Sequence, residues 1–317
     1  MFPFYVWIVI VIVAVIILGF LPMFFITKKI ATREFEDKLV RSTKNKWARE
    51  NSCPSNQEHS VMYDEGMAWA NNYADNRMPV EVCSCNLKLH GMYFDFSSKN
   101  CVIIIPGRAE SLNYSYYFAE PYRKAGYNIL VIDTRAHGLS EGKYVGCGIG
   151  EIPDVIAWSK FLKDQYSIEK IVIHGICVGS TTAVMAAVEE DCPKIDGIIA
   201  EGMFKSFYTI FKQRTKNGGH PTFMFMGHIF RLIKKYAGVD IKKQSPAAIM
   251  HKMDTPIMFF HSLKDDASLP VYAQELYDIC ASKIKKLVWF DNGAHSHIRI
   301  VNKDKYDGEI IDFLNLI

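Results

Sequence analysis

The sequence predicts an α/β domain that follows one membrane-spanning helix. An uncharged, apolar run covers residues 3–27, and β-branched strands alternate with helical stretches after residue 100. A third observation is the sequence Gly-x-Cys-x-Gly at 175–179, between one of these strands and a helix. Apolar strands separated by helices are typical of a parallel sheet covered on both faces, so we expect one full-sized domain and an attachment.

The apolar run is long enough to cross a bilayer. Residues 6–18 are almost entirely aliphatic, and at about 1.5 Å per residue the whole run spans a hydrocarbon core of roughly 30 Å. A cleavable signal peptide fits less well, because no basic residue precedes the run and no small-x-small site follows it. We therefore predict a transmembrane anchor over residues 1–27.

Flanking charge predicts the orientation of that anchor. The residues just after the run include Lys28, Lys29, Arg33, Lys38 and Arg41, whereas no basic residue precedes it. The positive-inside rule then places the following domain in the cytoplasm, as a single-pass protein of the cell membrane. A reducing compartment would also keep the eight cysteines free.

Composition excludes other classes of partner. The 37 basic and 34 acidic residues are spread along the chain, which argues against a nucleic-acid partner. The cysteines form no Cys-x-x-Cys pair and lack the histidine spacing of a zinc site, so we expect neither a metal nor a cofactor.

Residues 28–78 are predicted to form a helical linker that holds the domain close to the bilayer. An irregular apolar stripe runs from Glu34 to about Ala74, with an interruption at 53–56. The domain itself is expected over 79–317 and begins with an antiparallel pair of strands. Further strands are expected at 101–105, 128–132, 170–174, 195–200, 256–261 and 286–290, and helices at 114–125, 152–162, 178–188, 272–280 and 306–316.

The Gly-x-Cys-x-Gly sequence is typical of a nucleophile elbow that carries a thiol. A strand that turns sharply into a helix holds Cys177 in a strained conformation at the tip, and Gly175 and Gly179 leave room for the chain to pass. The positive end of the following helix favours a thiolate. Alone, the pattern also fits an inert buried cysteine, so the interpretation depends on an acid, a base and oxyanion donors elsewhere.

Other segments complete a resemblance to a known family. Pro106-Gly107-Arg108 follows the first parallel strand, Asp133 to Gly142 follows the next, and acid and base segments follow the last two strands. With the elbow, they resemble the α/β-hydrolase superfamily, and most closely its serine aminopeptidase and monoacylglycerol-lipase-like branch, with Cys177 in place of the usual serine. The resemblance covers roughly residue 80 to the C-terminus and implies the α/β-hydrolase fold.

The resemblance also implies the base and the oxyanion hole. The base is expected at His295, in the loop after the final strand, with His297 as the alternative. The two backbone donors of the oxyanion hole are expected to be the N–H groups of Val178 and Arg108. The Arg108 side chain either meets an anionic acyl substrate or is an ordinary surface arginine.

The acid follows the strand near residue 260. The family's His-Gly-x-x-Asp spacing selects Asp265, whereas counting back from Pro270 selects Asp266, because one residue is inserted and Ser262 replaces the usual glycine. We prefer Asp265, and expect the other aspartate to cap the next helix.

An insertion at about 203–246 would form a small lid over the site. We expect its Phe204, Phe207 and Met224 to line an apolar substrate pocket, although core packing of two short helices explains its composition equally well. In the loop from 133 to 142, Arg135 and His137 are expected to brace the structure and not to react.

These expectations together describe an acyl hydrolase. Cys177 would attack a small, apolar ester or thioester and form an acyl-enzyme, with His295 held by Asp265. A thiolate also leaves easily, so thioesters, activated esters and lactones are easier substrates than amides. Acyl transfer to an acceptor other than water, a catalytically silent scaffold and a redox-sensing thiol protein stay open as alternatives.

Overall fold

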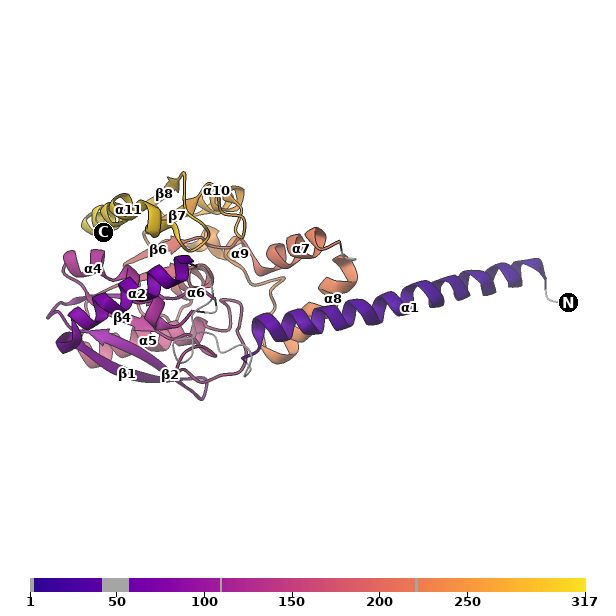
Figure 1. The fold of residues 1–317 in the computed structure, drawn as a ribbon, viewed down its shortest axis with the longest axis horizontal. Helices are drawn as coiled ribbons and strands as arrows, with labels where there is room; N and C mark the ends of the chain where they lie inside the picture. Colours follow the sequence, from indigo (N-terminus) through magenta and orange to yellow (C-terminus); the bar gives the residue numbers. More distant parts are fainter. Residues whose placement is uncertain (1–2, 42–56, 109, 220–221) are drawn as a thin grey trace.

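A long N-terminal helix, α1 (Phe4–Leu39), projects from the body of the molecule (Figure 1). The structure is a computed structural model and describes residues 3–41, 57–108, 110–219 and 222–317. The most apolar part of α1 has a mean hydropathy of 3.2 and none of it is buried, so by length and composition the helix can cross a membrane. The predicted boundary at residue 27 is not a break, because α1 continues to Leu39. The predicted interruption at 53–56 lies outside the described residues.

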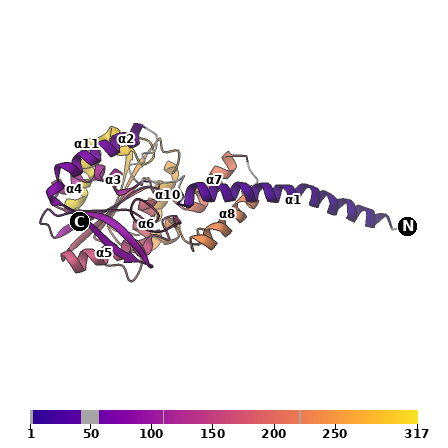
Figure 2. The ribbon, with the colours of Figure 1, turned by 60° about the horizontal axis from the view of Figure 1, so that its bottom comes forward.

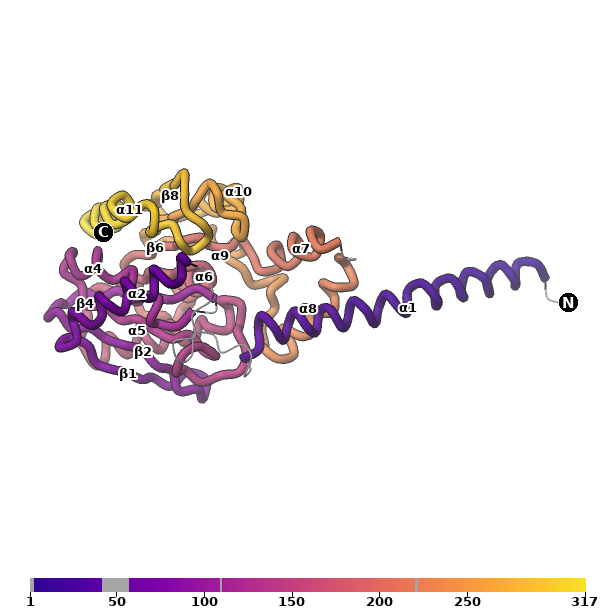
Figure 3. The backbone as a smooth tube through the Cα atoms, in the orientation of Figure 1, coloured from indigo at the N-terminus to yellow at the C-terminus, as the bar shows by residue number. Residues whose placement is uncertain are grey.

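The last turns of α1 are attached to the body. Buried Thr27, Ala31, Phe35 and Leu39 recur every fourth residue on one face of the helix. α1 packs along α8 (Thr222–Tyr236), and the two helices lie side by side in Figure 3. The Leu39 carbonyl also accepts a hydrogen bond from the N–H of Val145 at 3.0 Å. The base of α1 is therefore part of the fold.

Eight strands form one sheet in the order β1-β2-β4-β3-β5-β6-β7-β8. β2 is antiparallel to both β1 and β4, and all other neighbours are parallel. This confirms the predicted mostly parallel sheet that begins with an antiparallel pair. The strands are β1 (Arg77–Ser84), β2 (Leu87–Phe94), β3 (Asn100–Ile105), β4 (Asn128–Ile132), β5 (Lys170–Ile176), β6 (Gly197–Glu201), β7 (Ile257–Ser262) and β8 (Lys285–Phe290).

Helices cover both faces of the sheet, as predicted. α5 (Ile152–Tyr166) and α6 (Val178–Ala187) lie on one face, whereas α2 (Gln57–Asn72), α3 (Leu112–Ser115), α4 (Glu120–Lys124) and α11 (Ile298–Leu316) lie on the other (Figure 2). α10 (Pro270–Ile279) packs on β7 and β8, and α7 (Phe207–Asn217) pairs with α8 in the lid. The short elements are α9 (Pro246–Ile249), η2 (Ala74–Asn76), η3 (Tyr116–Phe118) and η4 (Met250–Lys252). Every residue of β4 and β6 is buried, which explains why both strands are apolar apart from Asn128 at the start of β4 and Glu201 at the end of β6.

Two predicted helices differ from the structure. The helix expected at 114–125 is divided into α3, η3 and α4, and Pro121 stands in the first turn of α4, where its missing N–H costs nothing. The helix expected from 306 begins eight residues earlier at Ile298 and is kinked at Asn302. The Asn302 amide donates to the carbonyl oxygens of Ile298 and Asn292, both at 2.8 Å, which holds this first part of α11 in place.

Glycine is required at two positions where α6 passes close to β3 and β5. A Cβ atom at Gly179 would lie 2.4 Å from the carbonyl oxygen of Ile105, and one at Gly175 would lie 2.4 Å from the backbone nitrogen of Ser180. Both obstacles are backbone atoms, which cannot move without displacing the sheet.

We expect Gly179→Ala to lower the free energy of unfolding by about 3 kcal/mol, because the added methyl group forces α6 away from β3. Thermal unfolding in detergent measures the effect. Gly308→Ala on α11 is the control: nothing lies within 4 Å of its added Cβ, and it is expected to stabilise the helix slightly. Equal unfolding temperatures of the two variants would contradict the packing argument.

Candidate active site

Cys177 forms the tip of a sharp turn between β5 and α6. Its backbone has φ +56° and ψ −112°, a region that residues other than glycine rarely adopt. Three hydrogen bonds hold this conformation: the Cys177 N–H donates to the Glu201 carbonyl at 2.9 Å, and the Ser180 hydroxyl donates to the carbonyls of Gly175 and Glu201. The thiol therefore lies at the N-terminus of α6, where the helix dipole favours negative charge.

Asp265 and His295 meet at the carboxyl ends of β7 and β8. The His295 Nδ1–H donates to Asp265 Oδ2 at 2.7 Å. The other carboxylate oxygen accepts the N–H groups of Ala267 and Ser268 at 2.9 and 2.8 Å. Asp265 is buried, whereas Asp266 is exposed to solvent. Of the two aspartates, the structure brings Asp265 to the histidine.

Ser262 explains how the loop with its extra residue still positions the acid. Its hydroxyl donates to the Gly293 carbonyl at 2.6 Å and accepts the N–H of Lys264 at 3.1 Å. A glycine at this position has no side chain to make either bond. Ser262 thus ties the acid turn after β7 to the base loop after β8.

The other ring nitrogen of His295 faces Cys177. Nε2 is buried and has no hydrogen bond of good geometry to any residue that the structure describes. Burial lowers the pKa of His295, but the nearby Cys177 and the Asp265 carboxylate outweigh burial and hold the pKa well above its usual value. Phe204 stacks on the ring with 5.2 Å between centroids. The arrangement favours a protonated imidazole between the sulfur of Cys177 and the carboxylate of Asp265.

A cavity of about 130 Å³ opens at the Cys177 thiol. Its lining comes from six separate parts of the chain and consists of His59, Gly107, Arg108, Glu110, Cys177, Phe204, Arg214, Ala267, His295, Ser296 and His297. The N–H groups of Arg108 and Val178 have no acceptor among the described residues. They are the two donors expected for an oxyanion, and both remain available to a ligand.

His59 and Glu110 belong to this cavity but were not predicted. His59, from α2, approaches Glu110 Oε1 at 3.2 Å, and Glu110 Oε2 accepts the Gly107 N–H at 3.0 Å. The His59 ring also meets the His297 ring edge to face at 4.5 Å. Burial, assisted by His59, lowers the pKa of His297, which keeps this alternative base neutral. The Asp265 carboxylate bonds to His295 and not to His297.

Predicted lid residues occupy different places. Phe204 lines the cavity, and Phe207 packs behind it with 5.5 Å between ring centroids. Met224 lies on α8 and does not line the cavity, because α8 packs against α1. In the loop after β4, Arg135 forms a two-pronged ion pair with Asp154 at 2.7 and 2.6 Å, which is the bracing contact expected of it.

His137 has no part in the cavity either. Its Nδ1 lies 3.0 Å from the hydroxyl of Thr134, and burial lowers its pKa to about 4. Across the described parts of the chain, no three histidine, cysteine, aspartate or glutamate residues gather where they could hold a metal ion.

Glu201, at the end of β6, connects the turn at Cys177 to the loop that carries His295. Its buried carboxyl accepts hydrogen bonds from the Tyr306 hydroxyl and, at 3.5 Å, from the Ile298 N–H at the start of α11. Tyr306 in turn contacts His174 Nε2 at 3.0 Å. Burial raises the pKa of Glu201 to about 7 even though the Tyr306 hydrogen bond opposes the shift.

Comparisons with known proteins agree with this architecture. Residues 100–212 match the family model described as alpha/beta hydrolase fold. The uncharacterized protein YqkD of Bacillus subtilis is 28% identical over 219 residues, which is 68% of this chain and 71% of that protein. An uncharacterized membrane protein of Saccharomyces cerevisiae is 26% identical over 223 residues, covering 69% and 72% of the two chains.

Solved structures with a similar fold also support this architecture. The esterase Pf2001 of Pyrococcus furiosus superimposes with a TM-score of 0.64 at 22% identity, over 78% of this chain and 93% of that chain. The chain therefore has the α/β-hydrolase fold, with its mostly parallel sheet, surrounding helices and one long apolar N-terminal helix.

The raised pKa of Glu201 predicts a pH dependence of stability. The folded-state pKa of about 7 exceeds the usual value of about 4.3, so the folded chain binds this proton more tightly and loses stability as pH rises from about 4 to about 7. We expect Glu201→Gln to reduce the fall in unfolding temperature between about pH 5 and about pH 8. The exposed Glu190→Gln is the control, and an unchanged fall in Glu201→Gln would refute the argument.

Proposed function

We propose that the chain is a membrane-anchored acyl hydrolase that cleaves an ester or thioester through Cys177, His295 and Asp265. The observation that carries this proposal is His295, which donates to Asp265 at 2.7 Å while its other nitrogen faces the thiol of a strained elbow. Nucleophile, base and orienting acid in this order are the parts that covalent acyl transfer needs.

The chemistry proceeds in two steps. In the first, the thiolate of Cys177 forms a bond from Sγ to the acyl carbon, the bond to the leaving group breaks, and the protonated His295 gives its Nε2 proton to the leaving group. In the second, His295 Nε2 takes a proton from water, the resulting hydroxide attacks the acyl carbon, and Sγ leaves. The N–H groups of Arg108 and Val178 stabilise the oxyanion in both steps.

The thiol restricts the substrate. A thiolate is a better leaving group than an alkoxide or an amine anion, so the tetrahedral intermediate of an amide would expel Cys177 again. Esters with good leaving groups and thioesters escape this problem. The yeast protein that resembles this chain is named as a membrane protein and the Pyrococcus structure as an esterase, which supports a membrane location and an ester substrate respectively. We further propose that residues 3–27 lie in the cell membrane and that the basic residues after them keep the domain in the cytoplasm.

Replacing the three residues tests the proposal. We expect Cys177→Ala and His295→Ala to lower kcat/KM for 4-nitrophenyl butyrate and for butyrylthiocholine by about 1,000-fold or more, because the nucleophile and its base act as a unit. Asp265→Asn should lose activity as well, whereas its exposed neighbour Asp266→Asn is the matched control and should keep it. Mass spectrometry of the quenched reaction should find a butyryl group on Cys177.

Two outcomes would decide against the enzyme. One is a wild-type protein that turns over neither substrate and whose iodoacetamide labelling at Cys177 is unaffected by His295→Ala; this favours a silent scaffold or a redox thiol. The other is full activity in Cys177→Ala. Sustained release of 4-nitrophenol only when an alcohol or amine acceptor is added, with the butyryl group recovered as an ester or amide of that acceptor, would favour the acyltransferase alternative.

A further inference from the structure

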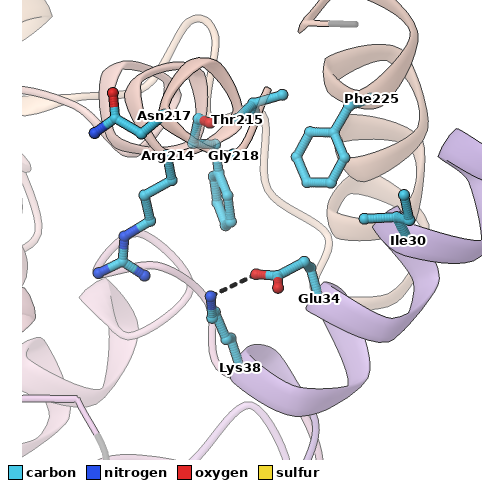
Figure 4. Close-up of a pocket in the computed structure, with 9 residues that line it drawn as sticks. Ile30, Glu34, Lys38, Arg214, Thr215, Asn217, Gly218 and Phe225 are labelled. Carbon is cyan, nitrogen blue, oxygen red and sulfur yellow. Dashed lines mark hydrogen bonds and ion pairs between the residues drawn. The ribbon is translucent and has the colours of Figure 1, made fainter. Parts of the chain in front are cut away.

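Arg214 lines two cavities at once. It lies near the end of α7, at the mouth of the cavity that holds Cys177, and it also lines a second cavity of about 340 Å³. The second cavity lies between α7, α8 and the base of α1, and its apolar wall comes from Ile30, Phe211 and Phe225. Figure 4 shows the Arg214 side chain extending from α7 into the space between α7 and α1. The guanidinium group thus stands where the two cavities adjoin.

Other charges around the second cavity are already paired. Lys38 donates to Glu34 at 2.5 Å, four residues earlier on α1 (Figure 4). In contrast, no carboxylate of a described residue lies within ion-pair distance of Arg214. Arg214 is exposed, so water can solvate its charge, but the charge remains available to an incoming ligand.

Arg108 supplies a second unpaired guanidinium, deeper in the site. It is partly enclosed, lies in the lining of the Cys177 cavity, and has no ion-pair partner among the described residues. The one nearby carboxylate, Glu110, is already engaged by the Gly107 N–H and by His59. Burial lowers the pKa of Arg108, and the positive charge of Arg214 lowers it further, while Cys177 and Glu110 act in the opposite sense.

An enclosed guanidinium without a partner is unfavourable until an anion binds. Desolvation of a charge costs free energy that a paired anion offsets, and arginine matches carboxylate, phosphate and sulfate with two parallel hydrogen bonds. Two arginines from different elements, the loop after β3 and helix α7, contribute positive charge to one cavity whose nucleophile is Cys177. The arrangement distinguishes Arg108 from an ordinary surface arginine.

We propose that Arg108 and Arg214 bind an anionic group of the substrate, so that the preferred substrate is an acyl compound carrying a carboxylate, phosphate or sulfate close to the scissile bond. The apolar part of that substrate extends past Arg214 into the second cavity. This assignment rests on the proposed function, because it names the substrate class of the same site.

Paired substrates test the assignment on the full chain in a non-ionic detergent. Mono-4-nitrophenyl adipate carries a carboxylate on the acyl part and 4-nitrophenyl hexanoate is its neutral match. 4-Sulfophenyl hexanoate carries the anion on the leaving group, with phenyl hexanoate as its match. These two arms separate an anion on the acyl side from one on the leaving group.

The measured quantity is the ratio of kcat/KM for the anionic and the neutral ester. In at least one arm, we expect Arg108→Gln and Arg214→Gln each to lower this ratio about tenfold, the usual effect of losing one charge-assisted hydrogen bond. Arg214→Glu should lower it further and raise turnover of cationic butyrylthiocholine. Arg231→Gln, on α8 and outside both cavities, loses the same charge and should leave the ratio unchanged.

A binding measurement keeps the assignment testable without turnover. Octyl phosphate should slow iodoacetamide labelling of Cys177 in the wild type and in Arg231→Gln, and much less in Arg108→Gln. The anion site would be overturned if the ratio of kcat/KM for the anionic and the neutral ester changed equally in all three glutamine variants. It would also be overturned if octyl phosphate did not slow iodoacetamide labelling of Cys177 in the wild type. Absence of turnover with protection intact would overturn the proposed hydrolase and leave the anion site standing.

Discussion

The active-site geometry depends on the strained backbone of Cys177 and on what holds it. A residue other than glycine at positive φ costs about 1–3 kcal/mol, and it persists only where surrounding contacts determine it. Here the Glu201 carbonyl fixes the Cys177 N–H, while the Glu201 carboxyl fixes Tyr306 and the first turn of α11. α11 begins directly after His297, so one residue at the end of β6 supports both the nucleophile turn and the base loop. Any change that moves β6 would therefore displace both the proposed nucleophile, Cys177, and the proposed base, His295.

Two histidines, separated by one residue, show how the cavity controls charge. His295 and His297 are both enclosed, and burial lowers the pKa of each. Only His295 lies beside Cys177 and has a carboxylate within hydrogen-bonding distance, and these two partners hold its pKa well above the usual value. His297 faces the ring of His59, and its pKa stays low. The partner, more than the degree of burial, decides which imidazole carries a proton in the resting site.

Much of the fold follows from local sequence, because each buried strand is a separate β-branched run with its own bounds. The elbow was predictable from its own residues, whereas Asp265 and His295 were expected from the resemblance to the α/β-hydrolase superfamily. A parallel sheet brings the carboxyl ends of its strands to one edge, and so these residues can meet. The site has other parts that are not local. His59 comes from α2, and the irregular apolar stripe of that helix carries no information about which loop the helix will cover. Glu110 contributes by accepting the backbone N–H of Gly107, an interaction that the residue types do not indicate.

The residues of the lid that face a cavity could not be predicted from the sequence either. Met224 and Phe225 are neighbours of similar character, and the sequence alone offers no way to know that α8 would turn one of them toward the base of α1. Arg108 could be interpreted in two ways from sequence. Its enclosure beside Cys177 and the absence of an ion-pair partner among the described residues favour the proposed anion site, and both depend on how the fold brings the loop after β3 and helix α7 together.

The continuity of α1 links the proposed anchor to the proposed substrate. Ile30, in the wall of the larger cavity, lies three residues beyond Thr27, where the uncharged run ends, and so about 5 Å farther along the helix. With residues 3–27 in a bilayer, this cavity would open at the level of the lipid headgroups. An acyl compound with an apolar chain and an anionic group concentrates at that same level, because the chain enters the hydrocarbon while the charge stays in water. The lid helix α8 packs on α1, so the helix that carries the proposed anchor and the proposed substrate-binding region form one unit. The anchor would then set the orientation in which the cavity meets its substrate.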